Sequence, residues 1–129
     1  MHADLSGAFE MPGCEQLSQA QAEAVSRLLC LLEAGEGAAA LSFSALARDV
    51  RIRGAASALT TIGREEADHG AWVAEIARAV PRPTSVRPAL DAARRLHIAI
   101  GQGSPAERLA GVAALDSAAC ILFSRLLRP

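Results

Sequence analysis

The sequence predicts an all-α helical bundle formed by a single domain at residues 17–129, and three observations lead to this prediction. The chain has 129 residues, which is enough for one domain with a core but too few for two ordinary domains. Its residues are 51% hydrophobic and only 3% aromatic, so small and aliphatic side chains that suit close helix packing must fill the core. Apolar residues recur every three or four positions, and no alternating β-branched run requires a strand.

Two long helices are expected in the first half of the chain. Residues 1–16 show little periodicity and are predicted to form a flexible N-terminal arm. The first helix is expected at residues 17–50, with Ser18 as the residue that caps its start. The second helix is expected at residues 55–80, and Pro81 stops it because proline cannot continue a helix.

The second half of the chain predicts one short and one long helix. A proline-containing linker at residues 81–88 precedes a short helix at residues 89–100, which ends at Gly101. The tetrapeptide at residues 104–107 is Ser-Pro-Ala-Glu, which has the form of a capping box with proline at the first helical position. It opens the last helix, expected at residues 105–127, so the bundle has three long helices and one short helix.

Polar residues interrupt the apolar stripes of the three long helices. Glu66 and His69 lie in the middle of the stripe of the second helix, where apolar residues are expected. Glu36 lies on the stripe of the first helix, and Asp116 interrupts that of the last helix. The stripe of the second helix comprises Leu59, Ile62, Glu66, His69, Val73, Ile76 and Val80.

These four residues, Glu36, Glu66, His69 and Asp116, are predicted to be metal ligands. A buried carboxylate is unfavourable unless it is paired or bound to a cation, and several together repel each other without a positive charge among them. Glu66 and His69 are three residues apart on one helix, so both project to the same side and can share one ion. The alternative interpretation is that each one is a core or edge residue satisfied by other partners.

Two further features of the sequence leave alternatives open. His97 lies either on the stripe of the short helix, as a further candidate ligand, or outward beside Arg94. Gly35 and Gly37 flank Glu36 inside a predicted helix, where each glycine costs up to about 1 kcal/mol relative to alanine. Either another helix or a ligand approaches closely there, or the helix breaks near Gly35.

Residues 33–39 are Glu-Ala-Gly-Glu-Gly-Ala-Ala, and residues 64–69 are Arg-Glu-Glu-Ala-Asp-His. Together these two segments resemble the first half of a ferritin-like or rubrerythrin-like di-iron protein. In that family the first long helix supplies a glutamate and the second supplies Glu-x-x-His about 30 residues later. Glu36, Glu66 and His69 match those positions. The resemblance implies a ferritin-like antiparallel bundle with non-haem iron, or manganese or zinc in its place, and oxygen, peroxide or small-molecule redox chemistry.

The second half of the chain departs from the family pattern. The family repeats its ligand set, but here Asp116 is followed three residues later by Ala119, so no second Glu-x-x-His is present. A complete two-metal site within one chain is therefore not expected. The alternative function is that of a metal-free, degenerate ferritin-like bundle that acts as an assembly or partner-binding module.

Charge and hydropathy predict the partners and the location. The net charge of −1 gives no electrostatic basis for binding nucleic acid or an anionic membrane. We expect neither a signal peptide nor a membrane span, and the three cysteines lack zinc-type spacing, so a cytoplasmic protein is predicted. Helices of such unequal length cannot cover one another's stripes, which predicts a homodimer or a second polypeptide that completes the bundle.

Overall fold

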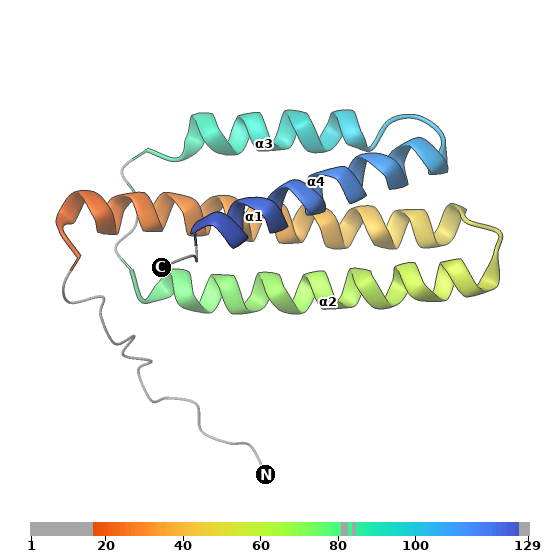
Figure 1. The fold of residues 1–129 in the computed structure, drawn as a ribbon, viewed down its shortest axis with the longest axis horizontal. Coiled ribbons are helices and arrows are strands. Elements are labelled where there is room, and N and C mark those ends of the chain that lie inside the picture. The colour runs from red at the N-terminus through yellow and green to blue at the C-terminus, as the bar shows by residue number, and fades with distance from the viewer. Residues whose placement is uncertain (1–16, 81–82, 84, 127–129) are drawn as a thin grey trace, which may run out of the picture.

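The computed structural model describes residues 17–80, 83 and 85–126, and all regular secondary structure in that part of the chain is α-helical (Figure 1). The helices are α1 (Gln19–Asp49), α2 (Arg53–Arg78), α3 (Arg87–Ile100) and α4 (Pro105–Leu126). The all-α prediction is confirmed. The predicted arm at residues 1–16, part of the predicted linker and the predicted last residue of the final helix lie outside the described residues.

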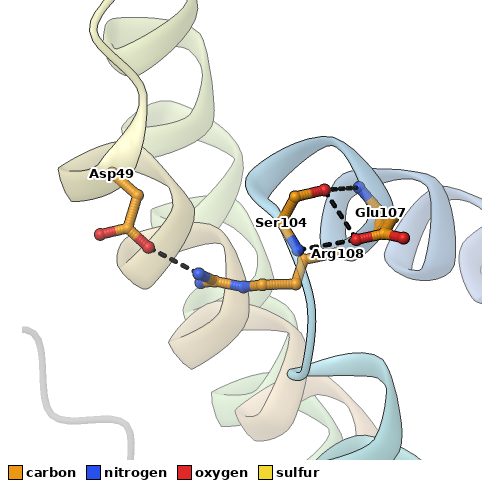
Figure 2. A network of polar contacts seen from close by, with 4 residues as sticks. All are labelled: Asp49, Ser104, Glu107 and Arg108. Atoms are coloured by element: carbon orange, nitrogen blue, oxygen red, sulfur yellow. Dashed lines mark hydrogen bonds and ion pairs between the residues drawn. The ribbon is translucent and has the colours of Figure 1, made fainter.

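Local hydrogen bonds explain where two of the helices begin. The Ser18 hydroxyl accepts a hydrogen bond from the backbone N–H of Gln21, and the Gln21 side chain accepts one from the backbone of Ser18. At the start of α4, Glu107 Oε2 accepts hydrogen bonds from the backbone N–H and the hydroxyl of Ser104, each at 2.8 Å (Figure 2). These bonds favour the carboxylate and hold the pKa of Glu107 below its usual value. Both predicted caps are confirmed.

Helix α1 is the central element of the bundle. It runs antiparallel to α2 along most of its length, and this pair forms the most extensive helix interface (Figure 1). Helix α3 lies along α1 on the side away from α2, and α4 crosses obliquely over α1. Helices α3 and α4 contact α1 and each other much more sparsely, so the four helices form a tight pair covered by a loose pair.

The tightly packed core lies at one end of the bundle. Its buried side chains are Phe43, Leu46, Leu59 and Val112, which come from the end of α1, the start of α2 and the first half of α4. At the same end Arg108 Nη1 donates a hydrogen bond of 2.6 Å to Asp49 Oδ2 and joins the start of α4 to the last residue of α1 (Figure 2). Packing is therefore densest where all four helices converge, and looser toward the middle of α1.

Helix α1 bears on two expectations from the sequence. It continues unbroken through Gly35 and Gly37, so the alternative of a helix break near Gly35 is wrong. By length and composition alone it is also apolar enough to cross a membrane, and only 6% of its most apolar stretch is buried in the chain itself. The expectation of no membrane span stays a prediction, because helices of soluble proteins can meet the same criterion of length and composition.

Candidate metal centre

Three side chains from the middle of α1 and α2 converge on one point. Glu36 comes from α1, and Glu66 and His69 come from successive turns of α2. One ligand atom from each lies within 4.8 Å of the other two. His69 Nδ1 is 3.8 Å from Glu36 Oε2 and 3.9 Å from Glu66 Oε2. The structure thus places three of the four predicted ligands in one cluster.

The close approach of α1 and α2 at this level explains why the three side chains meet. A Cβ atom built on Gly70 would lie 3.3 Å from the Cβ of Glu36 and 3.9 Å from the backbone nitrogen of Gly37. Since the position next to His69 has no side chain, the α1 backbone can come near α2. A larger residue there would press on Glu36 and move its carboxylate relative to Glu66.

The three side chains differ in their exposure to solvent. The side chains of Glu36 and Glu66 are 24% and 19% exposed, whereas that of His69 is 49% exposed. The expectation that His69 lies in a buried stripe is therefore wrong, because α3 and α4 cover α1 rather than the face of α2 that carries His69. The cluster has a shielded side at the carboxylates and an open side at the imidazole.

Burial and like charge make Glu66 a weaker acid than an ordinary glutamate. Loss of solvent raises the pKa of Glu66 to about 7, and the nearby carboxylates of Glu36 and Asp116 act in the same direction. His69 opposes the shift but does not cancel it. Without a cation, Glu66 is therefore partly protonated at neutral pH, and a metal ion would displace that proton.

Glu36 has an atom that the chain leaves unsatisfied. Its Oε2 atom is buried and has no hydrogen-bond partner among the described residues, and the 3.8 Å separation from His69 Nδ1 is too long for a hydrogen bond. A buried carboxylate oxygen without a partner is unfavourable by about 1–3 kcal/mol or more. Donor atoms about 2.1 Å from a shared ion lie roughly 3.0–3.5 Å apart, so a small inward movement of these three side chains would fit a metal ion.

Asp116 and His97 lie outside this cluster. Asp116 is exposed on α4, and among the described residues the set of mutually close ligand atoms comprises only Glu36, Glu66 and His69. Asp116 nevertheless lies near enough for its charge to act on Glu66. His97 and Arg94 of α3 line a space between α3 and α1 that Glu36 and Glu66 also border, but His97 does not belong to the set of mutually close ligand atoms found in the described part of the chain.

Trp72 is a neighbour of the cluster that was not predicted from the sequence. The indole ring of Trp72 lies 5.7 Å from the imidazole ring of His69, measured between ring centroids. Trp72 follows His69 by three positions, the same spacing that joins Glu66 to His69, so helical periodicity alone places it there. As the single tryptophan of the chain, it is a built-in optical reporter of the site.

Comparison with protein-family models, curated proteins and solved structures finds no match to this chain. The ferritin-like resemblance therefore remains an interpretation of the residues and their spacing.

Proposed function

We propose that this protein is a metal-binding helical bundle of the ferritin-like type, in which Glu36, Glu66 and His69 hold a divalent first-row ion, iron in the first place. The observation that carries the proposal is the cluster of three donor atoms within 4.8 Å, one of them a buried carboxylate oxygen without a hydrogen-bond partner. Carboxylate and imidazole donors suit iron and manganese, and zinc accepts them as well.

Each of the three residues would have a different role at such a site. Glu36 and Glu66 supply negative charge from two facing helices, and the ion relieves the repulsion between them. His69 supplies a neutral donor at the solvent-facing side, through which an ion can enter. Three protein ligands leave coordination positions open, and an iron ion held in this way supplies redox or Lewis-acid chemistry toward oxygen, peroxide or a small molecule.

The competing function is that of a metal-free module for assembly or partner binding. The position of Asp116 outside the cluster favours it, because the described part of the second half of the chain adds no ligand to the three. Large apolar side chains on the surface favour it too, Ile52 and Trp72 among them at 72% and 63% exposure. The two functions differ in whether the chain binds a metal tightly on its own.

A Mn²⁺ titration of the metal-free protein, followed by the fluorescence of Trp72, tests the proposal. Manganese prefers oxygen ligands to thiols, so the free cysteines do not compete, and a paramagnetic ion next to His69 quenches the indole. We expect saturable quenching with one ion per chain. Anaerobic Fe²⁺ is expected to give the same stoichiometry.

Glu66→Gln and Glu65→Gln form a matched pair for this titration. Both remove one carboxylate charge from adjacent positions of α2, but Glu65 is exposed and lies outside the cluster. We expect Glu66→Gln to weaken Mn²⁺ binding by at least about 100-fold and Glu65→Gln by less than about 3-fold. Equal effects of the two changes, or the absence of saturable quenching in the unmodified protein, would favour the metal-free function.

A further inference from the structure

The loose packing of α3 and α4 on α1 leaves a cavity of about 620 Å³ beside the two carboxylates. Its walls come from the middle of α1, from α3 and from α4, and Glu66 is the residue that α2 contributes. Glu36 and Glu66 therefore lie at one boundary of the cavity, whereas His69, the third member of their cluster, does not line it. A volume of this size is typical of small-molecule sites in proteins.

The walls of the cavity are strongly apolar. Leucine, isoleucine, phenylalanine, alanine and glycine make up most of the lining. The polar residues among the described lining residues are Ser42, Arg94, His97, Glu36, Glu66 and Asp116. Leu41, Leu96 and Leu115 line the cavity and remain 70%, 49% and 45% exposed. Since water fills an open cavity, the chain alone leaves these leucines in contact with solvent, which is unfavourable.

The α1 wall is built from residues too small to fill this space. Gly35 and Gly37 both line the cavity, and a Cβ atom at either position would meet nothing within 4 Å. No close helix contact therefore explains the two glycines. Each glycine keeps the wall open where a larger side chain would project into the cavity.

We propose that this cavity binds a small, neutral, apolar molecule, placed end-on or edge-on against Glu36 and Glu66. At about 30 Å³ for each water-sized group, the volume holds a molecule of roughly twenty heavy atoms or fewer. An anionic ligand is disfavoured because Glu36, Glu66 and Asp116 outnumber Arg94, the one arginine among the described lining residues. A strongly polar ligand would lose more hydrogen bonds to water than these walls can replace.

The inference deepens the proposed function, and only the position of the molecule next to a bound metal rests on that function. A metal held by Glu36, Glu66 and His69 would have the apolar molecule at its carboxylate side and solvent at its imidazole side. The substrate class for such a centre is then a hydrocarbon-like or aromatic molecule rather than a sugar, a nucleotide or an amino acid. A protein segment is not the expected occupant, because the cavity is a concave space between helices rather than an extended surface.

Fluorescence titration with the neutral apolar probe N-phenyl-1-naphthylamine tests the inference on the full chain without metal. Ala93 and Ala92 are adjacent on α3, but Ala93 lines the cavity whereas Ala92 is exposed and does not. We expect saturable probe binding to the unmodified protein, a loss of at least about 10-fold in affinity for Ala93→Phe, and less than about 2-fold for Ala92→Phe. Gly35→Leu, which fills the cavity from the α1 wall, should repeat the effect of Ala93→Phe.

The outcomes separate this inference from the proposed function. The inference is overturned if the unmodified protein does not bind the probe, or if both alanine variants bind it equally well. Circular dichroism checks that each variant is folded. If Ala93→Phe does not fold, the comparison of Gly35→Leu with Gly54→Leu tests the inference instead. Gly54→Leu is the control because a Cβ atom at Gly54 also meets nothing within 4 Å, but Gly54 lies outside the cavity. If the cavity variants lose probe binding and the unmodified protein binds no Mn²⁺, the apolar site is supported and the metal function is rejected.

Discussion

The carboxyl group of Glu66 is a weaker acid in the folded chain than in the unfolded one, and this difference links stability to pH. Its folded pKa of about 7 lies above the unfolded value of 4.5. Between these two values the folded state binds more protons than the unfolded state, so the free energy of unfolding falls as the pH rises. The contribution of Glu66 is complete below about pH 4.5 and is lost above about pH 7.

We therefore expect the metal-free protein to lose stability between pH 5 and pH 8, by about 1–2 kcal/mol once solvent screening of this partly exposed site is allowed for. The measurement is urea unfolding at several pH values for the unmodified protein and for Glu66→Leu. The variant should be the more stable of the two at pH 8 and should lack this part of the pH dependence. Parallel pH profiles of the two proteins would show that Glu66 is not the group responsible.

Saturating Mn²⁺ should reverse this dependence. Metal ligation requires the deprotonated carboxylate, so metal binding strengthens as the pH rises through about 7, and the bound ion stabilises the folded state. We expect the melting temperature of the unmodified protein at pH 8 to rise with Mn²⁺ while that of Glu66→Leu stays constant. A rise of equal size in both proteins would assign the metal to another site.

The sequence predicted which side chains of α1 and α2 meet, but not their surroundings. Helical periodicity is a local property, so it correctly related Glu66 to His69 and placed Glu36 on the facing stripe. The half-exposed state of His69 and the position of Asp116 outside the cluster depend on how α3 and α4 lie over α1. Nothing in the spacing of apolar residues specifies that arrangement, because the same stripes suit several crossing geometries.

Glycine determines how closely α1 and α2 pack along their shared interface. Gly63 is buried against α1, and a Cβ atom there would lie 3.0 Å from the Ser44 hydroxyl, 3.3 Å from the backbone oxygen of Ala40 and 3.4 Å from the Cβ of Phe43. The hydroxyl can rotate away, but the backbone oxygen cannot. Gly35 is the contrasting case, since a Cβ atom at that position has open space around it.

Alanine substitutions at these two glycines should therefore change stability in opposite directions. Gly63→Ala gains helix propensity but overpacks the interface, so we expect a net loss of about 1–2 kcal/mol. Gly35→Ala keeps the same gain without a clash and should stabilise the protein by up to about 1 kcal/mol. Chemical denaturation of both variants measures the difference. Stabilisation by both substitutions would mean that α1 and α2 are not in close contact at Gly63.

The elements themselves were predictable because their signals are local. Ser18 and Ser104 with their partners three residues later form the caps that the sequence pattern indicates, and both helices begin there. The continuity of α1 through Gly35 was not decided by local preference, since two glycines disfavour a helix at that point. The long stretches of good helix formers on both sides, and packing on α2, outweigh that local cost.

The whole molecule combines one well-packed helix pair with a second pair that covers it incompletely. Six large apolar side chains outside the cavity are exposed among the described residues, in addition to the three exposed leucines that line it. They are distributed over all four helices and the α1–α2 turn, and they are Leu28, Ile52, Trp72, Ile98, Leu109 and Ile121. A single small ligand in the cavity does not cover them.

We therefore predict that the chain associates with a second copy of itself. A two-fold dimer is the commonest way to bury such surface, and it would cover the outer faces of the helices that the bundle leaves open. Because Trp72 is exposed and lies next to His69, a partner on that face would also shield the open side of the Glu36, Glu66 and His69 cluster. Light scattering at micromolar concentration should give about 27 kDa, twice the chain mass of 13.4 kDa, with dissociation only on strong dilution. A mass of 13.4 kDa that stays constant over the whole concentration range, with and without Mn²⁺, would show that the chain is a monomer.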